Sequence, residues 1–313
     1  MIYLELSGGL GNQLFEYAMA RRVLEERRKE KPNEKMTLLL SRYSKDVRKY
    51  SLDSFMIDKN IQIVPMWKQS MIAMYYKIKK HLLMRTKIKD THLISGKKSF
   101  TVMCREGMLC TTDTYDYYPY TIPKKNNIYI YGNFQSEKYF QDIKEIILDE
   151  FQIKKSAIAI ESTILEDIKN KNSVAVHIRR GDYLSTEWGK KLDVCTQDYY
   201  INAMNYIIQN VKNPVFYVFS NTRDDLMWIK NNMKLPGTVQ YVDQDGSEID
   251  DFYLMSRCKH HIISNSTYSW WSSYIAREPD KIVVAPLFWY KTEDQNPKDV
   301  YLDTWTLIDI NKR

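Results

Sequence analysis

The sequence predicts an α/β protein of two domains. Its 313 residues are enough for two ordinary domains, and 44% hydrophobic with 27% charged residues is typical of a globular protein. Near the N-terminus, a short apolar strand, a glycine-rich loop and a long helix follow one another. From residue 174 to residue 285, apolar strands alternate with helices, a pattern that favours a parallel sheet covered on both faces.

The N-terminal domain is predicted to begin with a strand at Ile2–Leu6. The loop Ser7–Gln13 carries three glycines, and a helix follows from Leu14. Backbone N–H groups and the helix dipole would face this loop, which makes it a candidate ligand surface; a tight turn that binds nothing is the alternative. A dinucleotide fingerprint is disfavoured, because Leu14 stands where the third glycine belongs and the next strand, Met36–Leu40, is not followed by a ribose-binding acid.

Residues 66–98 carry a helical pattern that runs into a basic segment. Residues 77–98 contain eight lysines and arginines and a single acidic residue, Asp90. A solvated helix face with a loop is the simpler interpretation, and peripheral contact with anionic lipid of the inner membrane is the alternative. Further on, a strand is predicted at Ile128–Tyr131, and a helix runs from its N-cap Ser136 to about residue 150.

The domain boundary is placed near residue 154, which gives domains 1–154 and 155–313, with a C-terminal tail free to pack back on the N-terminal domain. The alternation in the C-terminal domain is regular. Strands are predicted at residues 174–178, 214–219, 239–242, 261–263 and 281–285, and helices at 156–170, 198–211, 224–233, 247–258 and 267–276.

Charged and hydroxyl side chains follow two of these strands. His177-Ile-Arg-Arg-Gly-Asp-Tyr183 places two arginines and an aspartate at a strand end, and Ser264–Trp271 places hydroxyls and an amide at a helix N-terminus. Guanidinium forks and helix N-termini both suit phosphate oxygens, and carboxyl ends of parallel strands share one rim. The two loops therefore predict a diphosphate site; taken alone, the first could be a surface turn held by an ion pair.

Composition limits the partner and the compartment. The net charge of +7 favours an anionic partner such as a nucleotide, a nucleic acid or a membrane surface. The four cysteines show neither C-x-x-C spacing nor a histidine motif, which indicates free thiols in a reducing compartment. No signal peptide is visible, and no apolar stretch reaches the ~18 residues that span a bilayer. A cytoplasmic protein is expected.

Four blocks of sequence resemble a known family. Gly8–Phe15, Asn133–Phe140, His177–Tyr183 and Ser264–Trp271 are similar, in this order, to the motifs of bacterial α-1,2-fucosyltransferases, glycosyltransferase family 11. One departure is Gly132-Asn133, where the family usually has an aromatic residue before Phe-Gln-Ser-Glu.

The resemblance implies a GT-B architecture of two Rossmann-like domains that face a cleft, with the acceptor on the N-terminal side and the donor on the C-terminal domain. It implies inverting transfer of L-fucose from GDP-β-L-fucose to the 2-hydroxyl of a terminal galactose, in the synthesis of a surface glycan such as O-antigen. The implied partners are GDP-fucose and a β-galactoside oligosaccharide, either free or lipid-linked. No cofactor, metal or nucleic acid is expected.

The same resemblance assigns roles by position. Arg179 is expected to neutralise the β-phosphate as GDP leaves. Apart from the resemblance, Asp182 is the first candidate for the base because it lies in the same loop, with an ion pair to an arginine as its alternative role. Asn12 is the third catalytic candidate. The predicted donor-binding residues are Gly9, Gly11, Asn12, His177, Arg179, Arg180, Ser264, Asn265, Ser266, Thr267 and Ser269.

Alternatives remain open at this point. Asp243-Gln-Asp245 follows a strand and could hold Mg²⁺ or Mn²⁺ against a diphosphate, although an acidic turn at a helix start is the simpler interpretation. A metal-dependent sugar-nucleotide transferase that uses Asp243 and Asp245 is therefore one rival. A basic nucleic-acid-binding protein and a sugar-binding module without catalysis are the others.

Overall fold

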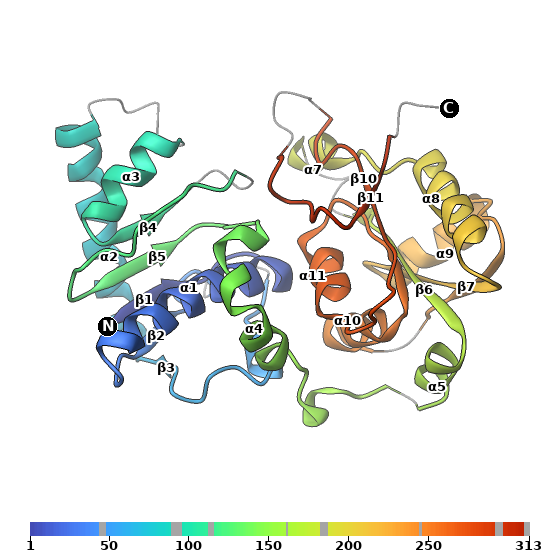
Figure 1. Ribbon diagram of the computed structural model, residues 1–313, viewed down its shortest axis with the longest axis horizontal. Coiled ribbons are helices and arrows are strands. Elements are labelled where there is room, and N and C mark those ends of the chain that lie inside the picture. Colours follow the sequence, from blue (N-terminus) through green and yellow to red (C-terminus); the bar gives the residue numbers. More distant parts are fainter. Residues whose placement is uncertain are drawn as a thin grey trace. The chain divides into compact units, whose positions relative to one another are not determined.

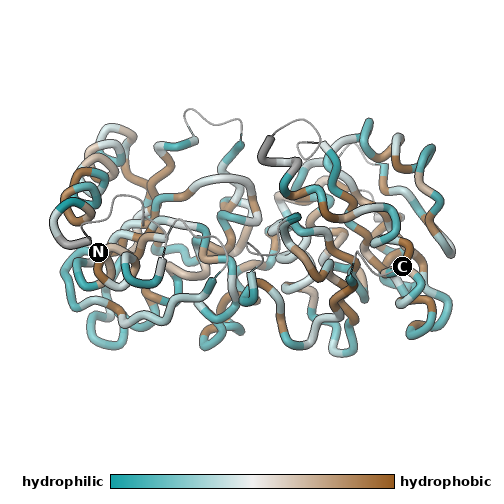
Figure 2. The backbone as a smooth tube through the Cα atoms, turned by 90° about the horizontal axis from the view of Figure 1, so that it is seen from above, coloured by the Kyte–Doolittle hydropathy of each residue, from teal (hydrophilic) through white to brown (hydrophobic). Residues whose placement is uncertain are grey.

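The chain folds into two compact α/β units (Figure 1). The computed structural model describes residues 1–43, 48–88, 96–111, 116–160, 162–181, 187–243, 246–291 and 297–309. The N-terminal unit comprises Met1–Gln152 with Lys298–Tyr301, and the C-terminal unit comprises Ile153–Pro297 with Leu302–Arg313. Each is built on a parallel sheet, which confirms the predicted α/β class. Hydrophobic and hydrophilic stretches alternate along the chain in both units (Figure 2).

The sheet of the N-terminal unit has the order β3-β2-β1-β5-β4. Because β2 and β3 continue on one side of β1 while β5 and β4 lie on the other, the strand order reverses between β1 and β5. Ligands of open parallel sheets bind in the crevice at the carboxyl ends of such a strand pair. The strands are β1 (Ile2–Glu5), β2 (Met36–Leu39), β3 (Gln62–Ile63), β4 (Met108–Cys110) and β5 (Ile128–Tyr131).

Helices of the N-terminal unit cover this sheet. Tyr3 and Tyr129 are neighbours across β1 and β5, and the Tyr129 ring stacks on Tyr76 of α2 at 4.3 Å. The same cluster includes Met103 of α3 and Met108 of β4, so α2 and α3 pack on one face. The helices are α1 (Leu10–Glu30), α2 (Met66–Leu83), α3 (Lys97–Arg105) and α4 (Lys144–Glu150), and a π-helical turn, Met84–Ile88, extends α2.

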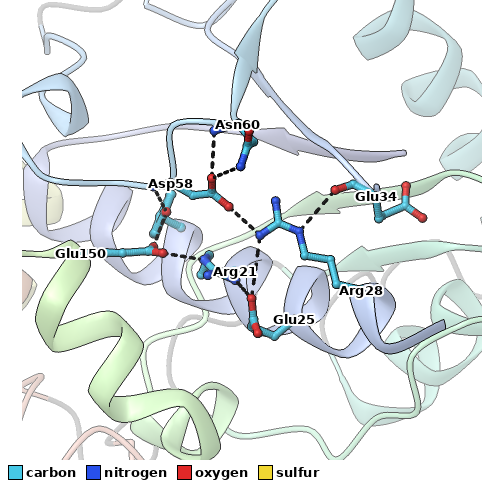
Figure 3. Close-up of polar contacts among 8 residues, drawn as sticks. Arg21, Glu25, Arg28, Glu34, Asp58, Asn60 and Glu150 are labelled. Atoms are coloured by element: carbon cyan, nitrogen blue, oxygen red, sulfur yellow. Dashed lines mark hydrogen bonds and ion pairs between the residues drawn. The ribbon is translucent and has the colours of Figure 1, made fainter. Parts of the chain in front are cut away.

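An ion-pair network holds α1 against its neighbours (Figure 3). Arg21 Nε lies 2.8 Å from Glu150 Oε1 of α4, and its Nη1 pairs with Glu25 one turn later. Tyr17 donates a hydrogen bond from its hydroxyl to Glu150 as well. Further along, Arg28 Nη1 lies 2.6 Å from Asp58 Oδ2. The guanidinium of Arg21 is nearly buried, and these carboxylates offset the cost of removing its charge from water.

Two helix boundaries predicted for the N-terminal unit were wrong. The first helix begins at Leu10 instead of Leu14, because the carbonyl of Gly9 accepts hydrogen bonds from the N–H groups of Asn12 and Gln13 at 3.0 and 3.1 Å. The helix expected from Ser136 is broken: Ser136 caps only a 3₁₀ turn at Glu137–Tyr139. Phe140, fully buried, has a φ of −146°, so the chain leaves the helical conformation there and α4 starts only at Lys144.

The sheet of the C-terminal unit has the order β11-β10-β9-β6-β7-β8, with β6 near its centre. Alternate residues of β6 enter different cores: Val174 and Val176 pack with α8 and α9, whereas Ala175 packs with α5 and α10. The strands are β6 (Asn172–Ile178), β7 (Pro214–Ser220), β8 (Thr238–Tyr241), β9 (His260–Ile262), β10 (Val283–Pro286) and β11 (Thr306–Ile308).

Six α-helices of the C-terminal unit lie within the described residues. Ser247 and Asp250 form a reciprocal capping box at the start of α10. The helix expected from residue 156 starts only at Ser162, after a 3₁₀ turn at Lys155–Ala157. The helices are α5 (Ser162–Asn170), α7 (Glu187–Leu192), α8 (Gln197–Asn210), α9 (Arg223–Asn232), α10 (Glu248–Arg257) and α11 (Thr267–Ile275).

Candidate functional site

The strand order of the C-terminal sheet also reverses, and it does so between β6 and β9. β7 and β8 continue on one side of β6, and β9, β10 and β11 follow on the other. β6 and β9 pair in parallel from Val174–His260 to Val176–Ile262, so the residues after both strands meet at one rim. Both loops predicted to bind a diphosphate start there, which is where this class of sheet binds ligands.

Side-chain hydrogen bonds join the two loops. His177 Nδ1 and Ser264 Oγ share a hydrogen bond of 2.9 Å, and Arg179 Nη1 donates to Ser266 Oγ at 3.1 Å. His177 is only 4% exposed. Its burial, and secondarily the charge of Arg179, lower the pKa of His177 to about 3. His177 is therefore neutral near pH 7, and Arg179 is the cation that contacts the serine loop.

Arg180, the next residue, points to the opposite side. Its guanidinium carbon lies 3.3 Å from the centroid of the Trp228 ring on α9, and its Nε lies 3.7 Å from Asp225 Oδ1. Stacking on an aromatic face and an ion pair to the same helix hold the side chain there. The structure thus brings Arg179, but not Arg180, to the serine loop.

The loop after β9 contains residues that fix its shape. Asn265 is 2% exposed, and its Nδ2 donates to the carbonyls of Leu192 and Trp289 at 2.7 and 2.8 Å. Ser269 is fully buried and donates from its hydroxyl to the carbonyl of Ser266 at 3.2 Å. Both side chains bind the protein's own backbone, so their contribution to a ligand site is to hold the loop in place.

Ser266 and Thr267 stand at the start of α11. Ser266 is the N-cap residue, yet its side chain makes no cap hydrogen bond; its hydroxyl accepts from Arg179 instead. At the other end of α11, Lys281 Nζ donates to the carbonyls of Ser273 and Ala276, each at 2.6 Å. The helix therefore has a cation at its negative end, and an arginine beside its positive end. An arginine together with helix N–H groups is suited to an oxyanion such as a diphosphate.

Two further groups at this site carried no clear signal in the sequence. The Tyr268 ring lies 5.5 Å from the His177 ring, and its hydroxyl donates to the carbonyl of Glu248 at 2.6 Å. Burial, and then the charge of Asp250, raise the pKa of Asp251 to about 7. The charge of Asp251 also raises the pKa of Tyr268, after burial itself. Carboxyls that titrate near neutral pH are concentrated at functional sites. The only hint was the acidic first turn of α10.

In the N-terminal unit, the glycine loop packs closely on its own helix. Gly8 has a φ of +72°, and a Cβ there would lie 2.6 Å from Asn12 Nδ2. A Cβ on Gly9 would lie 2.7 Å from Arg48 Nη1. Asn12 Oδ1 accepts a hydrogen bond from Gln135 Nε2 at 3.0 Å, which links two of the sequence blocks, and Gly11 is buried in the first turn of α1. The left-handed backbone of Gly8 thus favours a glycine, and the contact of Gly9 and Gly11 with a donor stays a prediction.

A charged pair that no motif indicated lies at the carboxyl end of β1. Glu5 Oε1 accepts a hydrogen bond from Arg42 Nε at 2.6 Å, and Tyr129 donates from its hydroxyl to the other oxygen of Glu5. The guanidinium of Arg42 stands 4.4 Å from the centroid of the Tyr131 ring. Because Glu5 and Tyr131 end β1 and β5, this cluster lies at the switch point of the N-terminal sheet.

Three aspartates that the sequence predicted at a site take no part in the contacts described above. Asp182 and Asp245 lie outside the described residues. Asp243 forms an ion pair with Arg223 at 3.1 Å. Within the ranges that the structure describes, no three His, Cys, Asp or Glu side chains are grouped so that they could hold a metal ion. In the same ranges, no helix has the length and apolar character needed to cross a membrane.

The family profile described as "Glycosyl transferase family 11" matches residues 1–309. The chain belongs to glycosyltransferase family 11. An Escherichia coli alpha-1,2-colitosyltransferase is 30% identical over 99% of both chains, and the E. coli O-antigen biosynthesis glycosyltransferase WbnK is 29% identical over 97% of this chain and 99% of its own. Galactoside alpha-(1,2)-fucosyltransferase 1 of Aotus azarae is 29% identical over 44% of this chain and 40% of its own.

Solved fucosyltransferase structures are also similar to this chain. Fucosyltransferase NodZ from Bradyrhizobium matches with a TM-score of 0.48 and 11% identity, over 87% of this chain and 90% of its own. A mutant of Arabidopsis thaliana FUT1 in complex with GDP matches with a TM-score of 0.49 and 10% identity, over 99% of this chain and 76% of its own.

Proposed function

We propose that this glycosyltransferase moves L-fucose from GDP-β-L-fucose to the 2-hydroxyl of a terminal galactose, with inversion at the anomeric carbon. The observation that carries the proposal is the contact of Arg179 with Ser266 at the N-terminus of α11, in a chain that belongs to family 11. A nucleoside diphosphate is the anion that this pairing of guanidinium and helix N–H groups suits.

The proposed reaction is a single displacement. The donor sugar is β-linked and the product α-linked, so one inversion suffices and no covalent intermediate is needed. The bond from the anomeric carbon to the phosphate oxygen breaks as the bond to the acceptor oxygen forms, and negative charge grows on GDP. Arg179 stabilises that charge more strongly in the transition state than in the ground state, which is the condition for catalysis. His177, neutral and bonded to Ser264, keeps the two loops together.

The acceptor is proposed to bind the N-terminal unit. Arg42, held by the buried carboxylate of Glu5, offers donors for sugar hydroxyls, and Tyr131 offers an aromatic face. A carboxylate is needed to take the proton of the attacking hydroxyl, and Asp182 remains the first candidate because it follows Arg179 closely in sequence.

One observation supports GDP-L-colitose as an alternative donor. The E. coli relative whose alignment covers 99% of this chain, at 30% identity, is a colitosyltransferase. Colitose is L-fucose without its 3-hydroxyl. A site that hydrogen-bonds a hydroxyl rejects the analogue that lacks it by a large factor, whereas an apolar contact discriminates weakly. The two donors are therefore distinguishable by their kcat/KM ratio.

The test is to incubate the protein with GDP-L-fucose or GDP-L-colitose and a panel of β-galactosides that includes lactose, N-acetyllactosamine and β1,3-linked isomers. We expect transfer from GDP-L-fucose, an α-1,2 linkage in the product, and full activity in EDTA. A higher kcat/KM with GDP-L-colitose than with GDP-L-fucose would show that colitose is the transferred sugar. Loss of activity in EDTA would favour the metal-dependent alternative. Binding to DNA together with neither transfer nor GDP binding would overturn the proposal.

The glycan that receives the sugar is proposed to be a bacterial surface polysaccharide. The WbnK relative, which matches 97% of this chain, is a protein of O-antigen biosynthesis. Comparison of a free oligosaccharide with the same sequence on a polyprenyl diphosphate would identify the natural form of the acceptor. A lower KM for the lipid-linked form is expected.

A further inference from the structure

Helix α2 is apolar on two opposite sides. On the inner side, Tyr76 and Leu83 are buried against the sheet and α3, and Ile72 packs against the same cluster. On the far side, large apolar residues are exposed to solvent. Trp67 is 66% exposed and Met71 65%, and the stripe continues through Met74, Tyr75, Ile78 and Leu82, all more than half exposed.

The exposed residues form one continuous stripe. At 100° per residue they fall within about 100° of the helix circumference, centred opposite the buried side. From Trp67 to Leu82 the stripe is about 22 Å long at 1.5 Å per residue. Scattered exposed apolar side chains are ordinary, but a contiguous apolar patch of this kind marks an interaction surface.

The charges beside this stripe all have one sign. No acidic residue occurs between Asp58 and Asp90. Lys68 flanks the stripe on one side and Lys77 on the other, both exposed, and exposed Arg85 follows at its C-terminal end. Two other cations of the basic segment contact the protein itself: Lys79 Nζ donates to the carbonyl of Glu106 at 2.7 Å, and Lys80 Nζ lies 6.0 Å from the centroid of the Tyr131 ring. The partner of the stripe must therefore be apolar and negatively charged.

We propose that α2 docks the protein on the surface of an anionic lipid bilayer, with the helix parallel to the membrane plane. An amphipathic helix of this type inserts its apolar face at the boundary of headgroups and acyl chains, where Trp and Tyr are favoured, and its lysines meet anionic headgroups. A second copy of the chain fits less well, because a two-fold contact would bring the lysines and arginines of both stripes together.

Vesicle co-sedimentation tests this surface without any measurement of activity. The full chain is mixed with vesicles of 30% phosphatidylglycerol and 70% phosphatidylethanolamine, or with vesicles of phosphatidylcholine alone. Binding to the anionic vesicles is expected to be at least ten-fold tighter, and to weaken in high salt. A double variant, Met71→Glu with Ile78→Glu, is expected to lose binding at least ten-fold.

Matched variants separate membrane docking from folding and from self-association. Because both side chains are solvent-exposed, the double variant keeps the unfolding midpoint of the wild type. Ile208→Glu, at an apolar residue of α8 that is 40% exposed, leaves vesicle binding unchanged. Equal binding to both vesicle types, or full binding by the double variant, would overturn the proposal. So would a wild-type dimer that ignores vesicles and that the double variant abolishes.

Discussion

Substitution of Arg179 by Ala is expected to lower kcat by about 10²–10³, because loss of one donor to a developing oxyanion costs about 2.7–4 kcal/mol. The contact between Arg179 and Ser266 predicts a second, smaller effect. Arg179 Nη1 donates to Ser266 Oγ, so Ser266→Ala removes a charge-assisted hydrogen bond that orients the guanidinium. At about 1.5 kcal/mol, this corresponds to a loss of roughly ten-fold. Transfer from GDP-L-fucose to lactose, measured at saturating donor, gives both values.

The neighbouring arginine provides the matched control. Arg180 is held by Trp228 and Asp225 on α9, away from the serine loop. Arg180→Ala is expected to cost about 1 kcal/mol of stability through the lost cation–π contact, and to leave kcat within a few-fold of the wild type. Equal losses of kcat in the two alanine variants, or near-normal turnover without Arg179, would refute the assignment of the leaving-group role.

Three other changes are expected to affect stability, and urea unfolding measures each. Glu150→Ala removes one of the two carboxylates paired with the nearly buried Arg21 and should cost about 3 kcal/mol. Lys29→Ala, at an exposed pair, should cost under about 1 kcal/mol, and similar costs would contradict the network. Between about pH 6 and pH 4 the unfolded chain binds a proton at His177 that the folded chain does not, since the folded pKa is about 3. Stability should thus fall by about 1.4 kcal/mol per pH unit on acidification, and a His177→Gln variant with an unchanged slope would exclude this. Gly132→Ala should cost several kcal/mol, because φ is +141° and a Cβ would lie 2.3 Å from a backbone oxygen; a wild-type midpoint would show that the loop relaxes.

The sequence predicted most of the C-terminal sheet because its strands carry their own signal. Val174–Ile178 is buried along its length and is bounded by charged residues, so the strand and its carboxyl end are visible locally. Strands that lack such a signal were missed. β3 spans only Gln62–Ile63 with both residues exposed, and β11 joins the sheet through pairing with β10, a long-range contact that no local pattern reports.

The site was predictable to the level of loops but not of side chains. Parallel strands place the loops after β6 and β9 at one rim, which follows from topology alone. The opposite directions of Arg179 and Arg180 depend on where Trp228 lies, and the anchoring of Asn265 depends on two distant carbonyls. The Glu5–Arg42 pair joins residues 37 positions apart that belong to no recognisable motif.

The two sides of α2 have different consequences for how this protein can change. Its inner side, with Tyr76 stacked on Tyr129, is fixed by the fold, because any replacement must fit an occupied space. Its outer side contributes little to the free energy of folding. Residues such as Met71 and Ile78 can therefore be replaced without loss of the unit beneath them. The exposed side of α2 can therefore change in sequence during evolution while the reaction at the candidate site stays the same.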